Sequence, residues 1–307
     1  MTVTPLEVRE RYEPSGGIDW RFAPLAAGTF IAALALGGLL YLLFQAGVYL
    51  LLLIPAFMAI PLSFLVYGAV RAGHCRSRLI GSALGLAAGV VLYLGSYYTG
   101  MVHSIGLGGW HRIDLLPRYI EWRAQNDVAR GNHGPADEKP KPGLNLFFMI
   151  LELSTVVFMT AFAGRASAGR TYCEDCRSWK RRKAIFLPPG SSAPFARALD
   201  SGDFSGLEGL QEIEMRVDTR QYAATILERC PSPGHAGGTC PTFLTVREIR
   251  FGGGAGTIPR LDLSIGRSPI DRVAIAPEEV SRLGRLFPAL AGPSRQEAAV
   301  PAPVEVA

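Results

Sequence analysis

Charge is missing from one long part of this sequence. Between Arg21 and Arg71 there is no Asp, Glu, Lys, Arg or His in 49 consecutive residues, although 19% of the whole chain is charged. One membrane-spanning helix needs only about 20 apolar residues. A single span therefore does not account for this run, which predicts two. We place the break between them at QAGVY, 45–49, which holds the only amide side chain in the run and a glycine.

The sequence also lacks the short motifs that mark several enzyme classes. It has no His-Glu-x-x-His, no Walker A sequence, no Gly-x-Ser-x-Gly and no paired acidic motif. The glycine-rich stretch GGGAG at 252–256 is followed by neither a Lys nor a helix, so we interpret it as a hairpin connection and not as a phosphate loop. These absences exclude an assignment to hydrolysis or phosphate chemistry, and we do not expect enzymatic activity.

Two further apolar runs complete a set of four predicted transmembrane helices. We place these helices at about 23–44, 48–70, 80–102 and 144–164. Thirteen Lys and Arg flank one side of the predicted membrane and six flank the other. Because cytoplasmic flanks are enriched in these residues, we expect both termini, with the N-terminal segment 1–22, to be cytoplasmic. The loop 103–143 is then outside, in a protein of the plasma or inner membrane.

The outer loop contains a helical pattern of its own. Leu116, Ile120, Ala124 and Val128 recur every four residues, with Tyr and Trp beside them. This spacing predicts an amphipathic helix that lies on the outer leaflet or on the end of the helix bundle. A helix that binds a partner protein is the alternative.

Three glycines in the third predicted span lie four residues apart, at Gly81, Gly85 and Gly89. Small residues at this spacing let another helix approach closely, which is how helices associate in lipid. We interpret the seam as packing within the four-helix bundle. A homodimer contact, or a contact with another membrane protein, is the alternative.

Glu152 is the only acid inside any predicted span. Counting about 1.5 Å per residue places it at the depth of Tyr93 and of Pro55, whose missing N–H leaves the carbonyl of Leu51 without its helical partner. We interpret Glu152 as a neutral carboxyl that joins helices through hydrogen bonds. The alternative is a small proton- or ion-coupled transporter centred on Glu152.

Residues 165–290 change in pattern and predict a small cytoplasmic α+β domain. We expect helices at 193–200, 205–213 and from about 277 to 288, and strands at 221–227, 242–251 and 260–265. Residues 291–307 are rich in Ala and Pro and low in aromatics, so we expect them to be disordered.

Four of the five cysteines lie in this domain, as the pairs Cys173 and Cys176, and Cys230 and Cys240. Cys-x-x-Cys lets two thiolates converge on one tetrahedral ion, and a second pair completes four ligands for Zn²⁺. The layout resembles a zinc ribbon, in which each of two knuckles supplies one pair of ligands. It departs from that pattern because nine residues separate Cys230 from Cys240, which makes His235 a rival fourth ligand.

Other uses of the cysteines depend on the compartment. In the cytoplasm stable disulfides are rare, so bound metal is the better use of four cysteines. A membrane-bound thiol oxidoreductase using Cys173 and Cys176 is an alternative, although the stretch lacks the βαβ setting typical of redox dithiols. Disulfides and unlinked thiols also stay open at this point.

A basic cluster follows the first cysteine pair. It consists of Arg177, Lys180, Arg181, Arg182 and Lys183. We expect this cluster to bind the anionic headgroups of the inner leaflet, and we do not expect nucleic-acid binding, because aromatic residues do not alternate with the charges. The sequence as a whole therefore predicts a four-helix membrane bundle with a cytoplasmic, zinc-ribbon-like binding or scaffolding domain.

Overall fold

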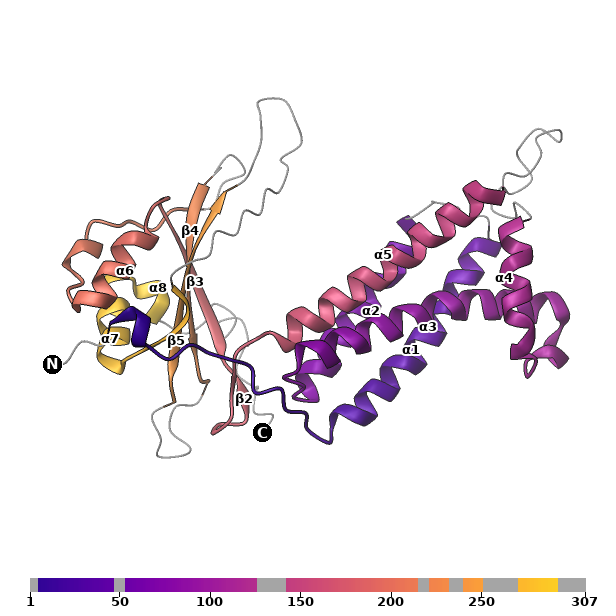
Figure 1. The fold of residues 1–307 in the computed structure, drawn as a ribbon, viewed down its shortest axis with the longest axis horizontal. Helices are drawn as coiled ribbons and strands as arrows, with labels where there is room; N and C mark the ends of the chain where they lie inside the picture. Colours follow the sequence, from indigo (N-terminus) through magenta and orange to yellow (C-terminus); the bar gives the residue numbers. More distant parts are fainter. Residues whose placement is uncertain are drawn as a thin grey trace, which may run out of the picture. The chain divides into compact units, whose positions relative to one another are not determined.

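The computed structural model describes residues 5–46, 53–125, 142–214, 221–231, 240–250 and 270–291. The chain divides into two compact units, drawn in Figure 1. The first is helical and comprises Pro14–Arg170. The second is built on a β-sheet and combines Met1–Glu13 with Thr171–Ala307.

The helical unit contains four long apolar helices. They are α1 (Phe22–Gln45), α2 (Leu53–Ala72), α3 (Arg78–Ile105) and α5 (Pro142–Ala168). Each is long and apolar enough to cross a membrane, which confirms the four apolar helices predicted from the sequence. Most of the expected turn at 45–49 and all of Leu51 lie outside the described residues.

The glycine seam of α3 faces α5. A Cβ atom at Gly85 would lie 2.1 Å from the carbonyl oxygen of Thr160, and one at Gly81 would lie 2.7 Å from that of Gly164. Gly89 faces the side chain of Thr160 in the same way. Only glycine allows backbones to approach so closely, and the three glycines therefore serve contacts within one chain.

The loop between α3 and α5 holds the short helix α4 (Leu116–Gln125), preceded by a 3₁₀ turn, η3 (Ile113–Leu115). Leu116, Ile120 and Ala124 are half-buried. The side-chain amide of Asn145, in α5, donates to the carbonyl oxygens of Arg123 and Ala124 at 2.7 and 3.2 Å. These bonds satisfy the C-terminal end of α4 and hold it against the bundle. Val128 lies outside the described residues.

The sheet unit is an antiparallel meander with the strand order β3-β4-β5-β6. Its strands are β3 (Arg181–Leu187), β4 (Gln221–Arg229), β5 (Thr242–Arg250) and β6 (Ile270–Ile275). A separate hairpin joins β1 (Tyr172–Cys173) to β2 (Ser178–Trp179). The helices α6 (Ser192–Ser201), α7 (Pro277–Leu286) and α8 (Pro288–Ala291) share one apolar core with one face of the sheet.

The sheet unit differs from the sequence prediction at several elements. The predicted helix 205–213 is wrong: only a 3₁₀ turn, η4 (Ser205–Leu207), forms, and the Ile213 N–H donates to the carbonyl of Phe186, in β3, at 2.8 Å and not to a carbonyl of a helix. Strand β3 was not expected. The predicted strand 260–265 and the turn 252–256 lie outside the described residues, and the fourth strand of the sheet is β6.

The N-terminal segment belongs to the sheet unit, which the sequence did not indicate. Leu6 is buried in the core of the sheet unit. The Tyr12 N–H donates to the carbonyl of Arg272 at 3.0 Å, and the Ala274 N–H donates to the carbonyl of Glu10 at 2.8 Å. The described part of the segment therefore extends the sheet beyond β6.

Candidate metal centre

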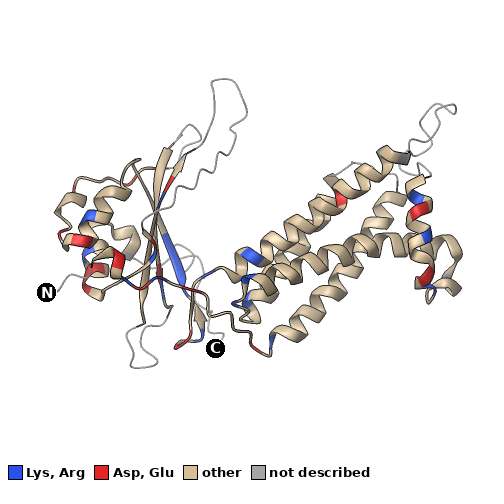
Figure 2. Cartoon of the chain, in the orientation of Figure 1, with Lys and Arg blue, Asp and Glu red and all other residues tan. Residues whose placement is uncertain are grey.

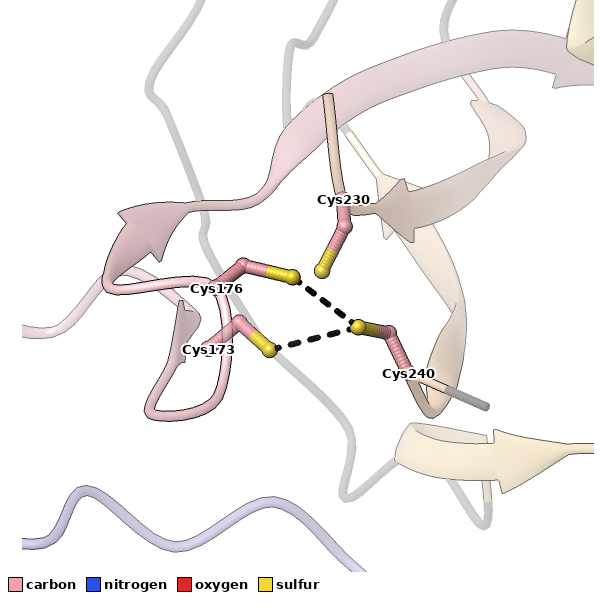
Figure 3. A group of neighbouring side chains, drawn as sticks. All are labelled: Cys173, Cys176, Cys230 and Cys240. Atoms are coloured by element: carbon pink, nitrogen blue, oxygen red, sulfur yellow. Dashed lines mark hydrogen bonds between the residues drawn. The ribbon is translucent and has the colours of Figure 1, made fainter. Parts of the chain in front are cut away.

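The four cysteines of the sheet unit come from two structural elements. Cys173 ends β1 and Cys176 lies in the turn that leads to β2. Cys230 directly follows β4, and Cys240 precedes β5. Since β4 and β5 are paired antiparallel neighbours, with Glu228 opposite Phe243, the second pair is brought to one end of the sheet. Figure 3 shows all four side chains pointing toward a common centre.

The spacing of the sulfur atoms suits one tetrahedral ion. All four sulfurs lie within 4.8 Å of one another. A zinc–sulfur bond of about 2.3 Å places the sulfurs of a tetrahedron roughly 3.8 Å apart. Cys173 and Cys240 are 3.8 Å apart, and Cys176 and Cys240 are 3.0 Å apart. None of these cysteines is in a disulfide, so four thiols are available to bind a metal ion.

The first knuckle depends on a tight turn. Arg177 has a φ of 46°, in the left-handed region, and its N–H donates to the carbonyl of Glu174 at 3.3 Å. This turn reverses the chain directly after Cys176, so that β2 pairs with β1 and both sulfurs lie on one side of the hairpin. The Cys-Glu-Asp-Cys spacing therefore places two sulfurs where they could act as a ligand pair.

The thiols differ in how easily they ionise. Burial acts to raise the pKa of Cys173, but hydrogen bonds from the Cys176 backbone and from the other three thiols outweigh it and lower the pKa. The hydrogen bond to Cys240, followed by burial, raises the pKa of Cys176 to about 11. Burial raises the pKa of Cys230 as well. Metal binding would therefore release protons from these thiols.

Lys180 is a buried cation beside the ligands. Its side chain donates to the carbonyl of Pro241, next to Cys240, and its Nζ lies 4.8 Å from the centre of the Phe243 ring. Only 4% of Lys180 is exposed. Four thiolates around a divalent ion would carry a net charge of −2, which a neighbouring ammonium would offset. Lys180 therefore does not lie on the surface, although the sequence predicted that the whole basic cluster would bind lipid headgroups there.

A buried carboxylate connects the two ligand arms. Glu228 accepts a hydrogen bond from the hydroxyl of Thr171 and forms an ion pair with Arg182. Thr171 is two residues before Cys173, and Glu228 is two residues before Cys230. Outer contacts of this kind fix the positions of metal ligands. Arg182, a second member of the basic cluster, is therefore used within the domain.

The N-terminal segment also reaches the first knuckle. The Tyr12 hydroxyl accepts a hydrogen bond from the Tyr172 N–H at 3.1 Å, directly before Cys173. The Tyr12 ring packs edge-on against Phe243, with 5.5 Å between ring centres. Sequence reasoning missed Tyr12, Thr171 and Glu228 as site residues. One available signal was an acid, Glu228, directly after the predicted strand 221–227.

Two other predicted residues have different positions. His235, the rival fourth ligand, lies outside the described residues. Cys75 is fully buried in the turn between α2 and α3, where its thiol lies 3.8 Å from the carbonyl of Ser77, and it is not part of the four-cysteine cluster. Burial raises the pKa of the Cys75 thiol.

Inside the helical unit, the structure brings Glu152 and Tyr93 together. The Tyr93 hydroxyl is 3.1 Å from Oε2 of Glu152, 3.0 Å from the carbonyl of Met149 and 3.1 Å from the Tyr97 hydroxyl. Glu152 is 7% exposed. The Tyr93 hydroxyl of α3 therefore lies within hydrogen-bond distance of α5 at both Glu152 and Met149.

No protein-family model, curated protein or solved structure was found to match this chain. Its function is therefore inferred from its own residues. Fold and site together define a chain with four apolar helices of membrane-spanning length and a sheet domain whose four clustered cysteines could hold a metal ion.

Proposed function

We propose that this chain is a multi-pass membrane protein whose sheet domain is built around a structural Zn²⁺ and acts by binding or scaffolding. The carrying observation is the convergence of four sulfurs, from Cys173, Cys176, Cys230 and Cys240, within 4.8 Å of one another. Four thiolates are the ligand set of closed zinc sites. Such a site has no open position for a substrate, which favours a structural over a catalytic ion.

The same cysteines fit a redox site or disulfides less well than they fit a zinc site. A redox dithiol needs one reactive pair, whereas here Cys240 lies near both Cys173 and Cys176. Disulfides would be unstable in the cytoplasm, where we place the domain. Zinc also supplies stability that a small domain needs, on the order of 10–16 kcal/mol in zinc-dependent peptides.

The N-terminal segment supports the proposed topology. Its backbone bonds to β6, which follows all four apolar helices in the chain. A segment cannot pair with a strand across a bilayer, so both lie on one side of the membrane. This arrangement requires an even number of membrane spans between the segment and β6, and four spans meet this requirement. The Lys and Arg asymmetry then assigns this side to the cytoplasm.

The metal is tested with the full-length protein purified in detergent. Elemental analysis should find about one zinc per chain. Cys173→Ser and Cys230→Ser should lose it, whereas Cys75→Ser, a matched buried cysteine outside the cluster, and His235→Ala should retain it. A cooperatively folded wild-type protein with four reactive thiols and no metal would contradict the proposal.

The topology is tested separately with epitope tags in intact cells. A tag inserted after Asn132 should be reached by antibody from outside, and a tag at the C-terminus should be reached only after permeabilisation. Extraction by alkaline carbonate should leave the protein with the membranes. Access to the C-terminal tag in intact cells would reverse the orientation.

A second candidate function, proton- or ion-coupled transport, has the contact between Tyr93 and Glu152 in its favour. Proteoliposomes containing the wild-type protein would then show a proton-dependent flux that Glu152→Gln abolishes without loss of stability. The helix-joining role predicts no such flux in either protein.

A further inference from the structure

Arginines gather at one end of the helical unit, as Figure 2 shows. At this end α1 and α3 begin and α2 and α5 end. The arginines are Arg21, Arg71, Arg76, Arg78, Arg165 and Arg170. Among the described residues of this unit, the acid at the same end is Asp19, which lies 3.7 Å from His74. The opposite end carries both signs, with Asp114 and Glu121 among its arginines.

Three of these arginines come close together at the end of α5. The guanidinium carbons of Arg71 and Arg170 lie 5.8 and 5.7 Å from the centre of the same Tyr67 ring. The Arg71 guanidinium also donates to the Tyr67 hydroxyl at 3.1 Å. The Arg78 side chain lies beside Gly169, the residue before Arg170. Its Nε is 3.2 Å from the position that a Cβ atom at Gly169 would occupy. Three cations from α2, α3 and the end of α5 thus share one region.

The backbone beneath these side chains is held firmly. The Ser167 hydroxyl, in α5, donates to the carbonyl of Tyr67, in α2, at 2.9 Å, and Ser167 is fully buried. This bond keeps the two helix ends in register. Guanidinium groups held on fixed helix ends present planar forks of N–H donors, and this geometry suits phosphate oxygens.

Exposed aromatic side chains continue from the arginines along the same helix faces. On α2, Phe64 is 73% exposed, and it lies one turn before Tyr67 and two turns before Arg71. On α5, Phe158 and Phe162 stack with 6.2 Å between ring centres and precede Arg165 at helical spacing. An apolar strip below a cationic group matches an acyl chain below a headgroup, whereas free phosphate would leave this strip without a role.

We propose that Arg71, Arg78 and Arg170 bind the phosphate of an anionic phospholipid, whose acyl chains lie along the exposed aromatic residues of α2 and α5. Basic sites between helices on the cytoplasmic side are suited to such headgroups. The inference rests on the proposed membrane insertion. It concerns residues of the helical unit and not the basic cluster after Cys176.

Native mass spectrometry of the full-length protein tests the site with phosphatidylglycerol and phosphatidylcholine as probes. The wild-type protein should retain phosphatidylglycerol in preference to phosphatidylcholine. The double variant R71Q/R170Q should bind phosphatidylglycerol about 30-fold more weakly, as expected for two lost cationic contacts. The matched control R112Q/R118Q, at the opposite end, should bind as the wild type does.

Several results would overturn the proposal. Equal retention of the two lipids by the wild-type protein would do so, as would equal losses in R71Q/R170Q and the control. Competition by inorganic phosphate would assign the site to free phosphate. If the double variant does not fold, Arg71→Lys keeps the charge but loses the fork, and it should still weaken phosphatidylglycerol binding. Zinc content and membrane extraction, measured on the same samples, show separately whether the proposed function fails.

Discussion

Loss of Arg9 should destabilise the sheet unit strongly. Its guanidinium binds both carboxylate oxygens of Glu279, at 2.7 and 2.8 Å, and it also donates to the carbonyl of Leu199 at 2.6 Å. The two charged side chains are only 6% and 14% exposed. Arg9→Ala leaves a carboxylate and a carbonyl buried without this partner. Breaking a buried pair in this way costs about 3–5 kcal/mol of unfolding free energy.

The measurement is denaturant unfolding of the full-length protein, with hydrogen exchange of the Ala274 amide followed alongside. That amide donates to Glu10, so it should exchange faster in Arg9→Ala. Arg112→Ala is the matched control, because its pair with Asp114 is 51% and 61% exposed and exposed pairs contribute about 1 kcal/mol or less. Adding Glu279→Gln to Arg9→Ala should recover part of the loss. An Arg9→Ala effect no larger than that of Arg112→Ala would refute docking of the N-terminal segment.

Three further predictions concern single side chains. Gly85→Leu should prevent α3 from packing on α5 and abolish folded protein in size-exclusion chromatography, whereas Gly68→Leu, where nothing lies within 4 Å of the added Cβ, should not. Glu152→Leu should lower the free energy of unfolding by about 1–3 kcal/mol through unpaired polar groups, and Glu152→Gln should leave it nearly unchanged. Lys180→Met should speed zinc transfer to a chelator, and Lys180→Arg should restore part of the wild-type rate, because the buried positive charge offsets that of the thiolates.

The four helices could be predicted because each comes from one uninterrupted apolar run, whose length alone carries the information. The cysteine cluster could be predicted for a related reason, since Cys173 and Cys176 form a local pair. That Cys240 joins them follows from the antiparallel pairing of β4 and β5, which places the chain before β5 beside the end of β4. The spacing of the cysteines along the sequence suggested Cys240 as the fourth ligand but did not exclude His235 from that position.

The missed features depend on contacts between distant residues. Strand β3 begins with Arg181, Arg182 and Lys183, which resemble a solvated basic surface until Glu228 is placed opposite Arg182 in the neighbouring strand. Burial of Lys180 depends on Phe243, far along the chain. Local patterns of charge and hydropathy contain no information about either partner.

Pairing of the N-terminal segment with β6 likewise joins residues that lie far apart in the sequence. Residues 5–13 contain one side chain of the core, Leu6, and are otherwise mostly polar or charged. Their place at the sheet edge is determined by backbone hydrogen bonds, which any sequence can form. The side chains that make the docking specific, Arg9 and Tyr12, find their partners more than 150 residues away.

X-ray absorption at the zinc edge, on the full-length protein, tests the central claim most directly. We expect one zinc surrounded by four sulfur atoms at about 2.3 Å, supplied by Cys173, Cys176, Cys230 and Cys240. A shell of three sulfurs and one nitrogen would instead indicate that an imidazole, such as that of His235, takes the place of Cys240. Folded protein that binds no zinc would contradict the metal-organised domain altogether.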